Sequence, residues 1–477
     1  MLRIALWLNN EMTLRPGDRV AICLPKSLET VQLVYGVLAA GAAYVPLPIQ
    51  EPVPRLLSIL TAIDPRLLIT VPQISHQLAA HRPKESLPPI RIVEPAAGGR
   101  GLDLLLSGTA HENAVAPARG DDLAAVFFTS GSTGEPKGVM WSQACLARTI
   151  AWARKRSAMS EKDKLISLAS LQYTTALDVF FPLASGCSVH LLSDREAQFA
   201  DHIVESSRRE GITIWSLSAT TLRLLLENGG MASGGLDTLR RVEFFGESLA
   251  IPVLRRLMAI LPQAEFVNIY GATEAYDMLS YPVPRPLPPN MEALPLGRAS
   301  WGNVVTLCDE SGTPVPPGAI GEICVRSERT MLGYWNDPVL TAARRLHGKR
   351  DSYRTGDLAV EGDDGLLKLV GRTDNVVKLR GHRFDLGEIE AVLKSHAPIR
   401  DAVAVPIPMA GDTIEIIAVI LAGKREGLES ELKRLCRSAE EQWAGRPLLP
   451  PEISSASQKM RSSTRWEDQA TAIQATP

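Results

Sequence analysis

The chain has 477 residues, of which 45% are apolar and 22% charged, values ordinary for a globular protein of two or three domains. Its 51 Lys and Arg nearly balance 53 Asp and Glu, so neither nucleic acid nor an anionic membrane is indicated as a partner. Six scattered cysteines favour reduced thiols in a cytoplasmic protein over a disulfide framework or a zinc site. No apolar run approaches the roughly 18 residues of a membrane-spanning helix, and the apolar start at residues 1–8 is too short for a signal peptide.

The first elements alternate between strand and helix. Residues 19–23 and 43–47 predict strands, and residues 27–40 between them have helical periodicity with Ser27 as the N-cap. Such a strand–helix–strand unit predicts a parallel sheet with helices on its faces. Residues 55–70 continue the alternation, whereas residues 83–122, rich in Pro, Gly, Ala and Arg, predict a loosely structured crossover.

A buried strand at residues 123–128 runs into a loop of small hydroxyls and glycines. The loop contains Thr129, Ser130, Gly131, Ser132, Thr133, Gly134 and Lys137. Backbone N–H groups, hydroxyl donors and one cation are what a polyphosphate cradle needs. The loop is not a Walker A motif, because Pro136 precedes the lysine and Gly138 follows it. The plain alternative is a flexible connector.

The rest of the chain divides into two patterns. Further strands are predicted at residues 165–168, 188–192, 212–215, 239–245 and 266–271, with helices at 142–157 and 220–227. From residue 300 short strands and turns predict a β-rich subdomain, with strands at 304–307, 311–313 and 321–325. After a boundary near residue 374, a helix at 387–393 and strands at 402–406 and 414–421 predict a smaller unit.

The sequence of residues 129–139 resembles the signature loop of the adenylate-forming superfamily. The motifs at residues 44–47 and 333–336 resemble those of nonribosomal-peptide adenylation domains more than those of CoA ligases. Matching motifs follow in the family's order at residues 39–47, 268–274, 353–358, 371–383 and 386–390. The resemblance implies an α/β fold: a large N-terminal domain of parallel-rich sheets with helices (residues 1–373), which includes the β-rich subdomain at about 300–370, and a small mobile α+β C-terminal domain (374–477). Asp374 is the implied hinge. Residues 333–338 match a further family pattern that we interpret as mainly structural.

The resemblance also assigns roles in binding ATP and Mg²⁺. It implies that Tyr270 stacks on the adenine, that Gly271 beside it also binds the nucleotide, that Thr273 contacts the α-phosphate and that Asp357 binds the ribose hydroxyls. Glu274 is the implied Mg²⁺ ligand, in keeping with the preference of this hard cation for carboxylate and phosphate oxygens. Simpler interpretations are a capping pair for Thr273 and Glu274 and a turn residue for Asp357.

Three further residues complete the implied catalytic set. Arg372 contacts the nucleotide, Lys378 belongs to a loop that enters the site in the second half-reaction, and Lys459 is the catalytic lysine. Gln458 stands where the family usually has Gly, so an ordinary surface lysine is the alternative for Lys459. Gln143 similarly replaces a His that the family often has after its signature loop.

The substrate pocket departs from the amino-acid-activating pattern. Alignment to the family places these residues in it: Tyr173, Thr174, Leu177, Glu243, Phe245, Ile269, Asp277 and Met278. Tyr173 stands where an Asp normally pairs with the α-ammonium of the substrate, and a phenol cannot balance that charge. Glu243 and Asp277 either meet an amine that sits elsewhere on the substrate, or face solvent or pair with an arginine.

We therefore expect ATP-dependent activation of a small carboxylic or amino acid as its acyl-adenylate, followed by transfer to the phosphopantetheine thiol of a carrier protein. An acyl-CoA or aryl-CoA ligase is the first alternative. A catalytically impaired relic of the fold is the second.

Overall fold

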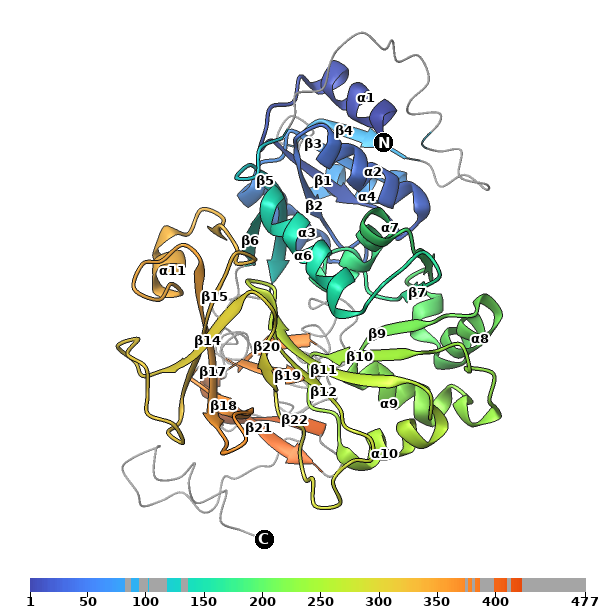
Figure 1. Cartoon of the computed structure of the whole chain (residues 1–477). Coiled ribbons are helices and arrows are strands. Elements are labelled where there is room, and N and C mark those ends of the chain that lie inside the picture. The colour runs from blue at the N-terminus through green and yellow to red at the C-terminus, as the bar shows by residue number, and fades with distance from the viewer. Residues whose placement is uncertain are drawn as a thin grey trace.

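The computed structural model describes residues 1–81, 87–93, 102, 118–129, 136–373, 376–379, 382–386, 399–409 and 413–422 (Figure 1). Several predicted features lie outside them: the loop residues Ser130, Gly131, Ser132, Thr133 and Gly134, the hinge Asp374, the helix at 387–393 and Lys459. Only the backbone of Lys378 is described. The predicted α/β class is confirmed, with two seven-stranded sheets and one four-stranded sheet.

The first sheet has the strand order β16-β6-β5-β2-β1-β3-β4. Its strands are β1 (Arg19–Cys23), β2 (Ala43–Pro46), β3 (Leu67–Thr70), β4 (Ile90–Ile92), β5 (Leu123–Thr129), β6 (Lys137–Ser142) and β16 (Gly333–Tyr334). The strands from β5 to β4 are parallel, and β6 and β16 run antiparallel to their neighbours. The predicted parallel unit is thus confirmed, while β4 is a strand inside the segment predicted to be irregular.

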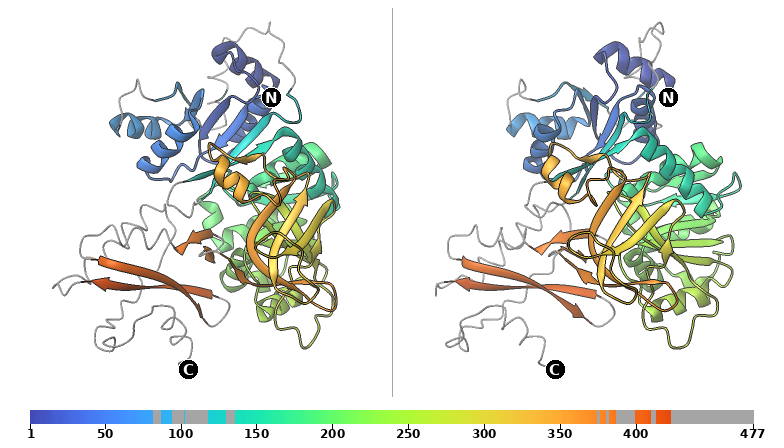
Figure 2. Two further views of the ribbon diagram at one scale, coloured as in Figure 1. Left: turned by 90° about the vertical axis from the view of Figure 1, so that its left-hand side faces the viewer. Right: turned by 60° about the vertical axis from the view of Figure 1, so that its left-hand side comes forward.

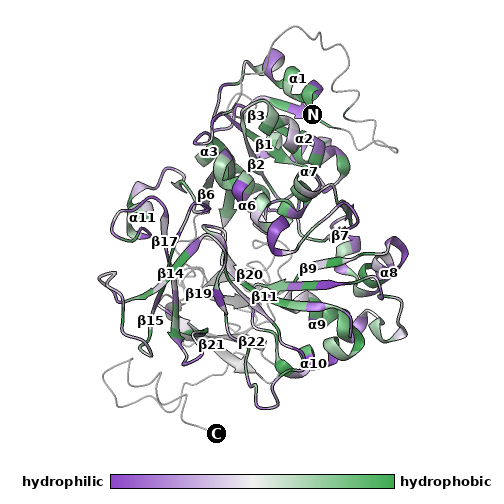
Figure 3. Cartoon of the chain, in the orientation of Figure 1, coloured by the Kyte–Doolittle hydropathy of each residue, from purple (hydrophilic) through white to green (hydrophobic). Residues whose placement is uncertain are grey.

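The helices around this sheet are α1 (Leu2–Met12), α2 (Leu28–Ala39), α3 (Val53–Ile63), α4 (Pro72–His81) and α6 (Gln143–Arg156). Ser27 and Ser142 cap α2 and α6 by accepting backbone hydrogen bonds, as polar N-cap residues do. Figure 3 shows that α2 carries both apolar and polar residues, as a helix with one buried face does. None of the described helices combines the length and the apolar character that a membrane span requires.

The second sheet has the order β13-β12-β11-β10-β9-β7-β8. Its strands are β7 (Lys164–Ser167), β8 (Ser188–Leu191), β9 (Ile214–Ser218), β10 (Arg241–Phe245), β11 (Glu265–Ala272), β12 (Tyr276–Pro282) and β13 (Arg298–Ala299). The accompanying helices are η2 (Thr174–Phe180), α7 (Phe181–Ser185), η3 (Glu196–Gln198), α8 (Ala200–Glu210), α9 (Ala219–Asn228), η4 (Met231–Ser233) and α10 (Ile251–Ile260). The predicted strands and the α9 helix are confirmed, whereas α8, α10, β12 and β13 were not predicted.

The segment predicted to be a β-rich subdomain contains a four-stranded antiparallel sheet, and its being a separate subdomain remains a prediction. It contains β14 (Asn303–Cys308), β15 (Gly321–Ser327), β17 (Ser352–Glu361) and β18 (Leu367–Arg372), and α11 (Pro338–Ala343) lies between β16 and β17 in the chain. The predicted strand at residues 311–313 is wrong, because the side chain of Asp309 accepts hydrogen bonds from Ser311 and Thr313 and closes a turn. Gly312 in this turn has φ 85°, which favours glycine.

Aromatic packing joins the two large sheets through η2. Tyr44 on β2 contacts Phe127 on β5 and Phe180 on η2, with ring centroids 5.8 and 6.2 Å apart. The ammonium of Lys26 donates to the carbonyl oxygen of Ser167 over 2.9 Å, which links the loop after β1 to the end of β7. Ser167 also donates from its hydroxyl to Asp178 in η2 over 3.0 Å, so this segment, which contains two predicted pocket residues, is bound to both sheets.

Two hairpins follow the β-rich sheet. They are β19 (Val376–Leu379) with β20 (His382–Asp385), and β21 (Ile399–Met409) with β22 (Thr413–Ala422). The predicted strands at 402–406 and 414–421 are therefore confirmed. Figure 2 shows the long β21–β22 hairpin standing apart from the two large sheets. The division of the chain at residue 374 remains a prediction.

Candidate active site

The predicted phosphate loop, residues 129–137, connects two antiparallel strands. Thr129 at the end of β5 pairs directly with Lys137 at the start of β6, so both residues lie at the base of the loop. A Cβ atom on the neighbouring Gly138 would lie 2.9 Å from Val126 Cγ1 and 3.1 Å from Trp335 Cβ. Close packing around Gly138 therefore leaves no room for a side chain and fixes the backbone that leaves the loop.

The turn between β11 and β12 presents Thr273 and Glu274. The turn is tight, because a Cβ on Gly271 would lie 1.6 Å from the carbonyl oxygen of Tyr276. Tyr276 itself has φ 51°, a strained conformation for a residue other than glycine. Trp141 of β6 donates from Nε1 to the Thr273 carbonyl oxygen over 2.9 Å. The turn is thereby attached to the strand that leaves the phosphate loop.

Glu274 is a buried carboxylate with one oxygen engaged. Its side chain is held by the hydroxyl of Tyr334, which donates to Oε1 over 2.8 Å, and burial together with this neighbouring charge raises the pKa of Tyr334. Within the described ranges no residue donates to Oε2, and no group of three or more His, Cys, Asp or Glu gathers as a metal cage. One carboxylate oxygen without a protein donor fits Mg²⁺, which usually binds one or two carboxylates together with substrate phosphates.

The three residues assigned to the nucleoside form one cluster. Tyr270 Oη donates to Oδ2 of Asp357, and Arg372 Nη1 donates to Oδ1 of the same carboxylate. Arg372 also donates to the carbonyl oxygen of Thr355 over 3.3 Å, and Asp357 pairs with Arg372 across β17 and β18. Each carboxylate oxygen has a second lone pair, so Asp357 can accept further hydrogen bonds from a ligand.

Glu243 and Asp277, predicted in the substrate pocket, are joined by an arginine that the sequence analysis did not identify. Arg156 donates to Oδ2 of Asp277 and to both oxygens of Glu243, and the three side chains are 6, 1 and 0% exposed in that order. Burial alone would raise the pKa of Glu243, but Arg156 and Arg241 together lower it to about 2. Pairing with an arginine, the alternative considered for these carboxylates, is thus what the structure shows for both.

The remaining acceptors of this network are also filled. Glu243 Oε1 accepts from the hydroxyl of Ser157 and from Arg241 Nε, and Asp277 Oδ2 accepts from Trp152 Nε1 over 2.9 Å. A buried network with this many hydrogen bonds favours a single arrangement of its side chains. Both carboxylates already face an arginine, so neither offers an unpaired charge to a substrate ammonium.

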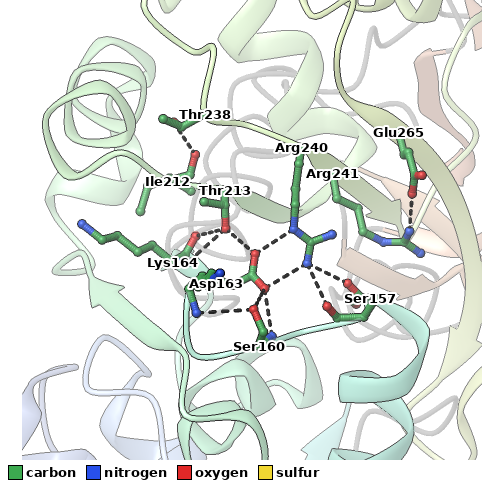
Figure 4. Close-up of polar contacts among 12 residues, drawn as sticks. Ser157, Ser160, Asp163, Lys164, Ile212, Thr213, Thr238, Arg240, Arg241 and Glu265 are labelled. Atoms are coloured by element: carbon green, nitrogen blue, oxygen red, sulfur yellow. Dashed lines mark hydrogen bonds and ion pairs between the residues drawn. The ribbon is translucent and has the colours of Figure 1, made fainter.

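Two adjacent arginines hold the end of α6, from which Arg156 projects. Arg240 Nη2 donates to the Ser157 carbonyl oxygen and Arg241 Nη2 to that of Arg156, each over 2.9 Å. Figure 4 shows Arg240 also paired with Asp163, where hydrogen bonds outweigh the effect of burial and lower the pKa of the carboxyl to about 2. The only sequence signal for Arg156 is a basic last turn of the helix, which is common at helix C-termini.

The other predicted pocket residues lie on neighbouring elements. Tyr173 directly precedes η2, Thr174 and Leu177 are buried within it, and Phe245 pairs with Ile269 across β10 and β11. Met278 is buried in β12, next to Asp277. The sheet thus brings Phe245 and Ile269 into direct contact, whereas a common cavity for the whole set remains a prediction.

A model of the AMP-binding enzyme family matches residues 1–335. The chain belongs to this family. It is 34% identical over 408 residues to an L-proline–[L-prolyl-carrier protein] ligase of Streptomyces coelicolor, an alignment that covers 81% of the chain and 75% of that protein. It is 33% identical to the phenyloxazoline synthase MbtB of Mycolicibacterium paratuberculosis, covering 85% of the chain but only 33% of that longer protein. The solved structure of the amide bond synthetase McbA from Marinactinospora thermotolerans matches 94% of the chain and 88% of its own, with a TM-score of 0.78 and 25% identity.

Proposed function

We propose that the chain activates a small carboxylic or amino acid with ATP, forms the acyl-adenylate and pyrophosphate, and transfers the acyl group to the phosphopantetheine thiol of a carrier protein. The observation that carries the proposal is the hydrogen-bonded cluster of Tyr270, Asp357 and Arg372. Tyr270 lies on the strand that leads into the Thr273–Glu274 turn, and Trp141 joins this turn to β6, the strand after the predicted phosphate loop. The name of one relative, an L-proline–[L-prolyl-carrier protein] ligase, supports this acceptor over coenzyme A.

Each of these residues has one task in the proposed reaction. Asp357 accepts the ribose hydroxyls while Arg372 holds that carboxylate in place. The hydroxyl of Thr273 donates to an α-phosphate oxygen, and Lys137 balances charge at the phosphates. A bound Mg²⁺ on Glu274 would neutralise charge on the phosphates during adenylate transfer. Since adenylate transfer needs little covalent help from the protein, orientation and charge balance supply most of the rate enhancement.

The C-terminal part of the chain supplies the remaining groups in this proposal. Lys459 contacts the reacting centre in the first half-reaction, and residues around Lys378 enter it in the second, after rotation about Asp374. Such a domain movement lets one site carry out two successive reactions.

The buried network also narrows the class of acid. Arg156 and Arg241 together balance the charges of Glu243 and Asp277, and Tyr173 stands where a carboxylate would bind an α-ammonium. We therefore propose an acid whose amine is displaced from the α-carbon or absent. Bulky Phe245 limits the acid to a small one.

The test is ATP–pyrophosphate exchange over a panel of acids: α-amino, β-amino, aryl and simple carboxylic acids. Exchange with at least one acid is expected, and its absence throughout would favour the catalytically impaired relic. Acyl transfer from the best acid is then compared between a phosphopantetheinylated carrier protein and free coenzyme A. Faster turnover of coenzyme A would replace the proposal with an acyl-CoA ligase.

A further inference from the structure

The segment of residues 331–335 is hydrogen-bonded to β6, the strand that follows the predicted phosphate loop, and to Glu274. The sequence suggested only a structural role for residues 333–338, which this segment overlaps. We propose that Tyr334 is a positioning residue: its hydroxyl orients the Glu274 carboxylate so that a single oxygen, Oε2, faces the metal–nucleotide complex. This inference rests on the proposed function and assigns to that site a residue that does not itself touch the ligand.

The backbone of the segment is hydrogen-bonded to both parts of the site. Met331 N donates to the Glu274 carbonyl oxygen over 2.8 Å, and Trp335 N donates to the Gly138 carbonyl oxygen over 2.7 Å. Between these two bonds Tyr334 pairs with Val139 as part of β16. The position of Glu274 relative to the end of the phosphate loop is therefore set by a stretch of five residues.

The side-chain contact adds an orientation that the backbone cannot give. Tyr334 is 5% exposed and Glu274 4%, so water does not compete freely for the carboxylate. The 2.8 Å hydrogen bond from Tyr334 Oη engages Oε1 and thereby fixes the rotation of the carboxylate about its last bond. Among the described residues Oε2 has no donor, which leaves that oxygen to a cation.

The path of the chain before Tyr334 is itself constrained. Gly333 has φ 146°, and a Cβ there would lie 2.8 Å from Thr341 Cγ2. The hydroxyl of Thr341 accepts from the backbone N–H of Tyr334 over 2.8 Å. These contacts hold the Tyr334 backbone, so that the ring reaches Glu274 from a fixed point.

The test variant is Tyr334→Phe, which removes the hydroxyl and keeps the ring. We expect the Mg²⁺ concentration for half-maximal pyrophosphate exchange to rise about tenfold, the scale of one hydrogen bond to a charged group, with the KM for the acid unchanged. Binding of Mn²⁺ to the enzyme–ATP complex, measured by electron paramagnetic resonance without acid, should weaken by a similar factor. The thermal midpoint of each variant shows whether it is folded.

Trp335→Phe is the matched control. Its indole donates to the carbonyl oxygen of Ala62 and lies on the same segment without touching Glu274, so the metal requirement should not change.

In a double-mutant cycle, Tyr334→Phe should add nothing to Glu274→Gln if the hydroxyl acts through the carboxylate. Additive losses, or an unchanged Mn²⁺ affinity in folded Tyr334→Phe, would overturn the inference. Wild-type protein that binds no Mn²⁺ with ATP would instead refute the proposed function.

Discussion

Trp141 and Thr273 are joined by a hydrogen bond from the indole Nε1 to the backbone carbonyl oxygen, 2.9 Å long. Trp141 is fully buried in β6 and its ring packs edge-on against Phe127, with centroids 5.7 Å apart. The turn that presents Thr273 is thus attached to the hydrophobic core of the first sheet, although it belongs to the second. The geometry of the candidate site consequently depends on packing between the sheets.

Replacing Glu274 with Gln should abolish most pyrophosphate exchange and leave the fold intact. The amide keeps the shape of the side chain and can still accept from Tyr334, but it loses the charge that would bind Mg²⁺. Exchange kinetics and a thermal unfolding curve measure the two effects. A large fall in the thermal midpoint with activity retained would identify Glu274 as a structural residue.

Replacing Arg156 with Met should destabilise the protein by about 3–5 kcal/mol, because two buried carboxylates lose their shared partner. The change is measured as the free energy of unfolding in urea. The matched control is the double variant Arg156→Met, Asp277→Asn, which removes one charge of each sign, leaves Glu243 paired with Arg241 and should recover much of the loss. If the double variant is no more stable than Arg156→Met, unpaired charge is not the cause.

Asp178 should make the protein less stable as the pH rises from about 4 to about 6. Burial raises the pKa of its carboxyl from 3.8 to about 6, an effect that Lys26 and a 3.0 Å hydrogen bond from Ser167 only partly oppose. Between these pH values the folded state binds more protons than the unfolded state, so raising the pH favours unfolding. The free energy of unfolding of the wild type, minus that of Asp178→Asn, should therefore fall across this window. A difference that is flat with pH would contradict the prediction.

The next prediction concerns the substrate and is tested by pyrophosphate exchange over the panel of acids. Standard α-amino acids should exchange weakly, and a small acid with a displaced amine or none should exchange more strongly, because the predicted pocket offers Tyr173 in place of an ammonium-binding carboxylate. Tyr173→Phe should then change the KM for the best acid. Dominant exchange with one ordinary α-amino acid that is indifferent to Tyr173→Phe would exclude this class of substrate.

Replacing Lys459 with Ala should abolish adenylate formation but spare thioester formation from a supplied acyl-adenylate. The prediction follows from the proposal that this lysine contacts the site only in the first half-reaction. The two half-reactions are measured separately, with wild-type protein as the reference. Equal loss in both steps, or in neither, would show that another residue has the role.

The sequence predicted those parts of the fold that local patterns determine. Ser27 begins α2 where the capping rule places it, and β5 ends where the glycines and hydroxyls begin. Strand β12 was missed because buried Asp277 interrupts its apolar pattern, and its pairing with β11 depends on a bulge at Tyr270 and Gly271. The helix α10 had a usable signal, with Pro252 in its first turn and apolar residues at helical spacing.

In the candidate site, too, the sequence predicted some residues, whereas others depend on tertiary contacts that it does not show. The motifs assigned Tyr270, Asp357 and Arg372 separately to the nucleotide, and the structure places the three in one hydrogen-bonded cluster. Arg156 could not be found in this way, because its contact with Glu243 depends on where α6 ends relative to β10. An arginine in the last turn of a helix is usually solvated, so only the tertiary arrangement identifies this one.

The short strand β16 has a consequence for how the protein folds. Gly333 pairs with Met140, which lies early in the chain, and until it arrives β6 is an unpaired edge of the first sheet. Contacts between such distant residues raise the contact order and slow folding. During synthesis β6 therefore remains an unpaired edge strand until residues 333–334 have been made, long after the other strands of the sheet. A chain truncated before residue 333 should aggregate even though it contains every other strand of that sheet.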